Sequence, residues 1–165
     1  SLGDLLDEIP VDAARWFFNS RPDTQMDFDL GLAVREDSEN PVYYVQYAHA
    51  RICSVIRNLA EDGHAVPDAA AADPAVLATE QERELIKQLA ELPDELLRSA
   101  NALDPSRINR YAMELAARFH RFYNACRIKG EADAVLNARL LLADCVRSAL
   151  ATCLNILGVS APERM

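Results

Sequence analysis

The stretch from Asn40 to Asn58, NPVYYVQYAHARICSVIRN, constrains the fold of this chain more than any other part. At about 100° per residue its apolar side chains fall on one stripe of a helix. Asn40 is a favourable N-cap, and Pro41 suits the first helical position because its missing N–H would have no intrahelical partner there. The stretch therefore predicts a helix with one buried stripe, formed by Val45, Ala48, Ile52, Val55, Ile56 and Leu59.

A second stripe of this helix, roughly a third of the circumference away, is aromatic and basic. Tyr47 and Arg51 stand one turn apart on it, together with Tyr44, Ser54 and Asn58. A ring and a guanidinium at this spacing can stack on an unpaired base and hold a phosphate. The same pattern fits tyrosines that flank a core and an arginine that is merely solvated. From the residues alone both interpretations stay open.

Length and composition favour a compact helical protein. The chain has 165 residues, which suffices for one domain or for a domain plus a piece of another. Half of its residues are hydrophobic and only 5 are glycine. No apolar run approaches the ~18 residues that cross a bilayer, and no charged-then-apolar leader is present. We therefore expect a cytoplasmic protein without a membrane partner.

The chain shows no pattern of a catalytic or metal site. Asp27 and Asp29 are paired carboxylates, but they have no nucleophile or metal ligand in sequence reach, and we expect a structural role such as helix capping. The histidines His49, His64 and His120 are scattered. The cysteines lack CxxC or Cys/His spacing, and we expect reduced, mostly buried thiols. They are Cys53, Cys126, Cys145 and Cys153.

The net charge of −9 argues against a generic nucleic-acid binder, which is usually basic. The charges are segregated along the sequence, however. Acids collect in residues 4–12, 23–37 and 73–95, whereas basic residues crowd one later stretch. These basic residues are Arg107, Arg110, Arg118, Arg121, Arg127 and Lys129.

Further helices follow from caps and periodicity. Pro10 separates two short helices, Thr79 with Glu82 forms a capping box, and Gly130 and Gly158 suit helix ends. An alanine- and proline-rich connection covers residues 61–79, with room for one helical turn. Arg139 and Arg147 are expected on the outside of the last helix. The predicted helices span residues 2–9, 11–20, 80–92, 93–103, 104–126 and 133–157, with Leu96, Leu97, Ala100 and Leu103 as the apolar side of the fourth.

Several stretches resemble arginyl-tRNA synthetase, a class I enzyme. ENPVYYVQYAHAR resembles the first helix of its anticodon-binding domain, ARFHRFYNACR a later helix, and LNILGVSAPERM its C-terminus. DAARWFFNSRPDTQMDFDL resembles the part directly after the loop related to KMSKS. The chain itself has neither a KMSKS-like nor a HIGH-like stretch. The resemblance covers residues 2–165.

The resemblance implies an all-α helical bundle of the class I synthetase anticodon-binding (DALR) type. Residues 1–38 would be a short remnant of the catalytic, stem-contacting region, and residues 39–165 the anticodon-binding domain. In the family, the tyrosine at the position of Tyr123 meets the anticodon loop, and the terminal methionine folds back and touches it. The expected tRNA-binding residues are Tyr47, Arg51, Tyr123 and Met165.

The function implied is recognition without chemistry. The expected partners are the anticodon loop of an arginine tRNA and the remainder of the synthetase chain. This chain would hold no cofactor and no catalytic residue, whereas the full-length enzyme would join arginine to its tRNA with ATP and magnesium. The alternative is a helical protein–protein interaction module that does not bind RNA. A basic patch joining Arg51, Arg121 and Arg127 would favour RNA, and a uniformly negative surface would favour the module.

Overall fold

The computed structural model of this chain describes residues 2–22 and 27–165. Residues 23–26, which belong to an expected acidic stretch and to the run DAARWFFNSRPDTQMDFDL, lie outside the described residues. Within the described part, no helix combines the length and the apolar character that a membrane crossing needs. All its regular structure is helical, as predicted: α1 (Leu2–Glu8), α2 (Val11–Ser20), α3 (Leu30–Ala33), α4 (Pro41–Glu61), α5 (Glu80–Ala90), α6 (Leu92–Ala102), α7 (Ser106–Ala125) and α8 (Asp133–Ile156), with 3₁₀ turns η1 (Ala69–Ala71) and η2 (Pro74–Val76).

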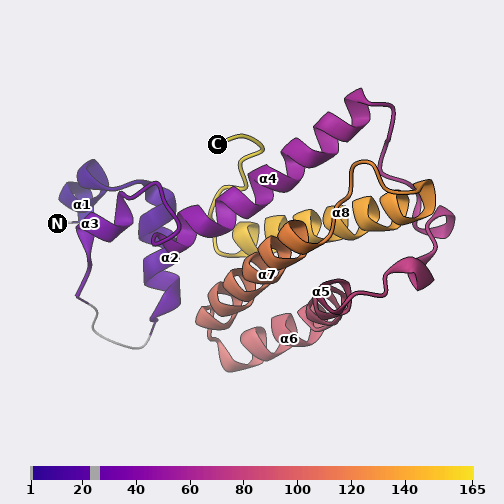
Figure 1. The fold of residues 1–165 in the computed structure, drawn as a ribbon. Helices are drawn as coiled ribbons and strands as arrows, with labels where there is room; N and C mark the ends of the chain where they lie inside the picture. Colours follow the sequence, from indigo (N-terminus) through magenta and orange to yellow (C-terminus); the bar gives the residue numbers. More distant parts are fainter. Residues whose placement is uncertain (1, 23–26) are drawn as a thin grey trace.

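Helices α4, α7 and α8 form the centre of the molecule, with α5 and α6 along α7 and with α1–α3 at one end (Figure 1). The start of α8 lies near the end of α4, where Lys129 Nζ is 2.5 Å from Asp62 Oδ2. Beyond the other end of α8, the Ser160 carbonyl oxygen accepts a hydrogen bond of 3.0 Å from Gln46 Nε2 near the start of α4. Helix α8 therefore runs antiparallel to α4.

The predicted helices begin at or within two residues of their expected starts, whereas α3 was not among them. Asn40 Oδ1 accepts a hydrogen bond of 3.3 Å from the Val42 N–H, which confirms the N-cap of α4. The Asn40 amide also donates to the Arg35 carbonyl oxygen over 2.8 Å, so this residue ties α4 to the segment before it. Asp29 caps α3 through the Leu32 N–H at 2.9 Å. The capping box of α5, formed by Thr79 and Glu82, is present.

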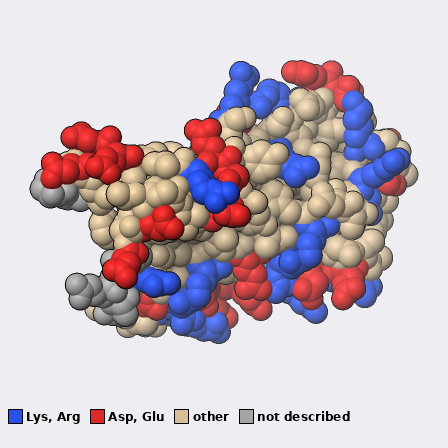
Figure 2. Space-filling view, turned by 60° about the vertical axis from the view of Figure 1, so that its left-hand side comes forward, with Lys and Arg blue, Asp and Glu red and all other residues tan. Residues whose placement is uncertain are grey.

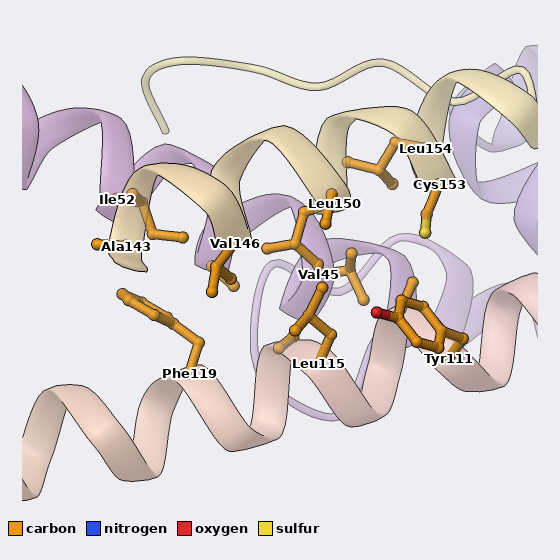
Figure 3. Close-up of a cluster of buried hydrophobic side chains, with 14 of the residues drawn as sticks. Val45, Ile52, Tyr111, Leu115, Phe119, Ala143, Val146, Leu150, Cys153 and Leu154 are labelled. Atoms are coloured by element: carbon orange, nitrogen blue, oxygen red, sulfur yellow. The ribbon is translucent and has the colours of Figure 1, made fainter. Parts of the chain in front are cut away.

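Buried apolar side chains from α4, α7 and α8 meet in one core (Figure 3). Val45, Ala48 and Ile52 of α4 are fully enclosed, whereas Val55 and Ile56 of the same predicted stripe are only half-buried. Each enclosed large side chain contributes about 1.5–3 kcal/mol. The predicted stripes of α7 and α8 are buried throughout: Ile108, Ala112, Leu115, Phe119 and Phe122, and Leu142, Val146, Ala149, Leu150, Cys153 and Leu157.

The N-terminal helices share this core. Trp16 of α2 is only 2% exposed. Its carbonyl oxygen accepts a hydrogen bond of 3.1 Å from Asn109 Nδ2 of α7. Residues before position 39 thus pack directly on α7, and the boundary between residues 38 and 39 stays a prediction.

One predicted apolar side is wrong at three of its four residues. Leu97 and Leu103 were expected to pack, but they are 60% and 88% exposed, and Ala100 is exposed as well. Leu96, the fourth predicted residue, does pack against the core, and Leu92 packs beside it. Leu103 ends the helix with φ of 53°, the left-handed region in which helices commonly stop.

A second prediction is also wrong. Arg139 was expected on the outer face of α8, but its side chain is largely enclosed. Its side chain is 11% exposed, and its Nε is 2.6 Å from Oε1 of Glu82, a fully buried carboxylate of α5. Arg139 also donates to the Arg127 carbonyl oxygen. Burial alone would raise the pKa of Glu82, but hydrogen bonds from Arg139 and Thr79 outweigh it and hold this pKa below its ordinary value.

Replacing Arg139 tests this ion pair. Arg139→Ala is expected to lower the free energy of unfolding by about 3–5 kcal/mol, because it leaves the Glu82 carboxylate buried without its cation. Arg147→Ala is the matched control, since Arg147 pairs with Asp144 at 2.7 Å in a partly exposed place. The control should lose less than about 1 kcal/mol. Urea unfolding followed by circular dichroism measures both, and equal losses would contradict the assignment.

Candidate nucleic-acid interface

Arg51 of α4 lies between two tyrosine rings. Its Cζ atom is 4.2 Å from the ring centroid of Tyr123 on α7 and 5.9 Å from that of Tyr47 on α4. Both distances fall within the ~6 Å at which a cation is attracted to a ring face. Tyr47 is 41% exposed, so the group opens to solvent rather than to the core. The seam between α4 and α7 therefore presents a guanidinium with an aromatic ring of each helix within cation–π distance.

The C-terminal tail is held across α4 by polar contacts, most of them part-buried. Gln46 Nε2 donates to Asp12 Oδ2 over 2.8 Å and to the Ser160 carbonyl oxygen over 3.0 Å. The Ser160 hydroxyl donates to the same Asp12 carboxylate. Further along, the Pro162 carbonyl oxygen lies 2.9 Å from Nδ1 of His49. These contacts fix the path of the tail, although its sequence shows no periodicity.

This path places Met165 beside the arginine and tyrosine of α4. Met165 lines a hollow of about 370 Å³ together with Tyr47, Arg51, Ser54 and Arg57. Its side chain is 54% exposed. With the ring contact between Arg51 and Tyr123, the structure brings the four residues named from the sequence into one continuous surface.

The basic residues divide into paired and unpaired ones. Arg51, Arg121 and Arg127 form no ion pair with any described residue, whereas most of the basic stretch is paired. Tyr123, against which Arg51 rests, lines a further hollow of about 420 Å³ with Arg127. The paired residues are Arg107 with Glu95, Arg110 with Asp104, Arg118 with Glu84 and Glu114, and Lys129 with Asp62.

The charged surface is mixed rather than uniformly negative. Figure 2 shows acidic side chains gathered beside the N-terminal helices and basic side chains spread among acidic ones elsewhere on this face. Burial raises the pKa of Tyr44, and the charge of Arg121 partly opposes this rise. Arg121 therefore lies near the seam as well. Arg51 contacts the ring of Tyr123, and Tyr123 and Arg127 line one hollow, so the surface here is not the uniformly negative one expected of a protein-docking module.

Sequence reasoning missed three residues of this surface. Tyr43, His120 and Asn124 line a hollow of about 390 Å³ that also includes Tyr47 and Arg51. A signal was present, because Tyr43 and Tyr47, and likewise His120 and Asn124, stand four residues apart on one helix face. What the sequence does not show is that these two faces meet.

The ring of His120 is enclosed by aromatic neighbours. Its centroid lies 5.0 Å from the ring of Tyr44 and 6.1 Å from that of Tyr47. Its Nε2 atom is buried and has no hydrogen-bond partner among the described residues. Burial, together with the charge of Arg51, lowers the pKa of His120 to about 4. The imidazole is therefore neutral at pH 7 and serves as an uncharged aromatic wall.

The lowered pKa of His120 predicts a loss of stability in mild acid. Between pH 6.5 and about 4 the unfolded chain binds a proton at this residue that the folded chain does not, so stability falls as the pH falls through this window. His120→Gln should therefore show a smaller drop in Tm between about pH 7 and about pH 5. Calorimetry at the two pH values measures it, with His64→Gln as the control. An equal drop in wild type and His120→Gln would contradict the assignment.

The cysteines form neither a disulfide nor a metal cluster within the described residues. Cys53, Cys126 and Cys153 are buried, as predicted for most of the thiols, while Cys145 is exposed. Burial raises the pKa of Cys153 to about 12, so this thiol stays protonated.

Comparison with known proteins agrees with this geometry. Residues 45–165 match the DALR anticodon binding domain, so the match contains most of α4, together with α7, α8 and the tail that build the surface. This chain belongs to the DALR anticodon-binding domain family.

Among its relatives are two arginine–tRNA ligases. The protein from Symbiobacterium thermophilum is 55% identical and that from Acetivibrio thermocellus 49%, each over the whole of this chain and over 30% and 29% of its own length. A crystal structure assigned to an arginyl-tRNA synthetase of Campylobacter jejuni superposes with a TM-score of 0.87 at 36% identity, over 98% of this chain and 35% of that one. The Thermus thermophilus arginyl-tRNA synthetase superposes with a TM-score of 0.80 at 30% identity, over 93% of this chain and 26% of that one. The chain thus spans less than a third of the length of these curated relatives.

Proposed function

We propose that this chain recognises the anticodon loop of an arginine tRNA as part of a longer arginine–tRNA ligase. The observation that carries the proposal is the position of Arg51, which lies between Tyr47 and Tyr123 in a surface completed by Met165. This is the arrangement of rings and positive charge that single-stranded RNA binds. Membership of the DALR family supports it.

Binding would rest on stacking and on phosphate contacts. Unpaired bases can stack on the exposed ring of Tyr47 and on the ring of Tyr123, each contributing about 1–3 kcal/mol. Arg51 is already held by both rings, so little side-chain entropy would be lost when it meets a phosphate or a base. The unpaired Arg127 and Arg121 would add attraction for the backbone despite the acidic net charge.

Specificity would come from the central anticodon base. All arginine codons carry G in the middle, so every arginine tRNA offers C at that position. The hollow beside Met165 holds the polar groups of Ser54 and Arg57 next to the ring of Tyr47. Such groups can read the Watson–Crick edge of a base whose face is stacked.

The remaining roles belong to the longer protein. The ligase would join arginine to the tRNA with ATP and magnesium at a distant site, and binding of the anticodon here would help to settle the acceptor end there. Residues 1–38 would be the end of the catalytic region, and the contact of Trp16 with α7 would connect the two parts. We place this activity in the cytoplasm, where tRNA is charged.

Substitutions at the seam test the proposal. Tyr123→Ala should weaken binding of this chain to an arginine tRNA roughly 5- to 150-fold, which corresponds to about 1–3 kcal/mol for one stacked base. Arg51→Ala should weaken binding and lower its dependence on salt, because one phosphate contact is lost. Fluorescence anisotropy with labelled tRNA at several salt concentrations measures both effects.

Two variants serve as controls. Tyr123→Phe keeps the ring and should bind nearly as wild type, and Arg83→Ala removes an exposed arginine of α5 on another part of the molecule. In the full-length ligase, Tyr47→Ala and Tyr123→Ala should slow aminoacylation. Unchanged tRNA affinity in Tyr123→Ala and Arg51→Ala, with unchanged aminoacylation, would overturn the assignment of these residues.

A further inference from the structure

Helix α2 is hydrogen-bonded to the point where α8 ends and the C-terminal tail begins. Asn19 Nδ2 donates to the Leu157 carbonyl oxygen over 3.1 Å, and Arg15 Nη1 donates to the Gly158 carbonyl oxygen over 2.6 Å. Carbonyl groups at a helix end have no partner within the helix. Side chains of α2 therefore satisfy the end of α8, and Figure 1 shows the tail turning back from this point to run beside α4.

Asp12 of α2 makes the next contact along the tail, and it uses both of its carboxylate oxygens. Oδ1 accepts a hydrogen bond of 3.2 Å from the Ser160 N–H, and Oδ2 accepts one from the Ser160 hydroxyl. Gln46 Nε2 of α4 donates to the same Oδ2 over 2.8 Å. Hydrogen bonds to an ionised acceptor are roughly twice as strong as those between neutral groups. The carboxylate thus joins α2, α4 and the tail at one point.

The tail beyond this point is short. Met165 follows Ser160 by five positions, and residues 163–165 are exposed. Between them, the Pro162 carbonyl oxygen lies 2.9 Å from Nδ1 of His49. The place of Met165 beside Tyr47 therefore depends on few contacts, of which the one with Asp12 comes from outside α4.

Asp12 is poorly suited to contact RNA directly. Its carboxylate repels phosphates, so an acid that acted only through its charge would weaken binding. Asp12 is not among the described residues that line the two hollows beside Arg51, and it precedes the matched residues 45–165. A favourable effect of Asp12 on recognition would therefore have to pass through the tail.

We propose that Asp12 is a positioning residue of the RNA-binding surface, which acts on Met165 through Ser160. The inference rests on the proposed function and extends it to α2, a helix that precedes the matched domain. Asp12 holds the tail on the path that brings Met165 to the hollow beside Tyr47. Without this contact the last residues are free to leave the hollow, and ordering them again becomes a cost of binding RNA.

The first test compares RNA affinities of variants of the whole chain by fluorescence anisotropy with a labelled arginine tRNA. Asp12→Ala should weaken binding several-fold, although it removes a negative charge. Asp7→Ala removes an exposed carboxylate of α1 and is the matched control, with unchanged or tighter binding. Met165→Ala should also weaken binding, and Asp12→Ala should add no further loss in that background. The losses of Asp12→Ala and Tyr123→Ala should instead multiply.

The second test needs no RNA. Amide hydrogen exchange followed by mass spectrometry should show several-fold faster exchange of residues 160–165 in Asp12→Ala than in wild type, with unchanged exchange in α7. Circular dichroism checks folding. Ser160→Ala, at an exposed position, removes only the hydroxyl contact. It should show the same effects to a smaller extent and provides the test if Asp12→Ala does not fold.

The outcomes separate this inference from the proposed function. If Met165→Ala and Tyr123→Ala weaken binding while Asp12→Ala binds as Asp7→Ala does, the positioning role is overturned and the proposed function stands. A further loss from Asp12→Ala in the Met165→Ala background, or unchanged exchange of residues 160–165, would also overturn it. If the wild-type chain does not bind the tRNA, the proposed function falls and this inference falls with it.

Discussion

The surface of this domain depends on how α4 packs against α7 and α8. Val45, Ala48 and Ile52 of α4 are fully enclosed by these helices, which fixes the rotation of α4 about its axis. Once this stripe is buried, the neighbouring stripe with Tyr47 and Arg51 must lie at the seam with α7. The guanidinium there contacts a ring from each helix. The packing of α4 against α7 and α8 therefore both stabilises the bundle and forms the proposed binding surface.

The acidic net charge is compatible with this surface because many acids pair with cations or accept hydrogen bonds within the chain. Glu82 is fully buried against Arg139, and Asp12 fastens the C-terminal tail through Ser160. Such carboxylates neutralise cations or satisfy backbone groups rather than repel a ligand. The arginines at the seam, represented by Arg51 and Arg127, are left without acidic partners among the described residues. Distribution of charge, rather than its sum, decides what this domain can bind.

Local sequence signals predicted most of the fold, and long-range contacts explain the failures. Caps such as Asn40 depend on a few neighbouring residues, so the helix starts could be found without a structure. The burial of Arg139 could not be predicted from the sequence, because it depends on a glutamate of α5 that is distant in sequence. The site was predicted at Tyr47, Arg51 and their partners through resemblance, whereas the hollow of His120 arises only where two helix faces meet.

The most direct test of the central claim is the affinity of this chain for an arginine tRNA transcript and for the same transcript with its central anticodon base changed. Both are measured at low and at high salt. The account predicts tighter binding to the unaltered tRNA at each salt concentration, with both affinities falling as salt rises. Equal affinity for the two transcripts, or no binding to either, would contradict recognition of the anticodon by this domain.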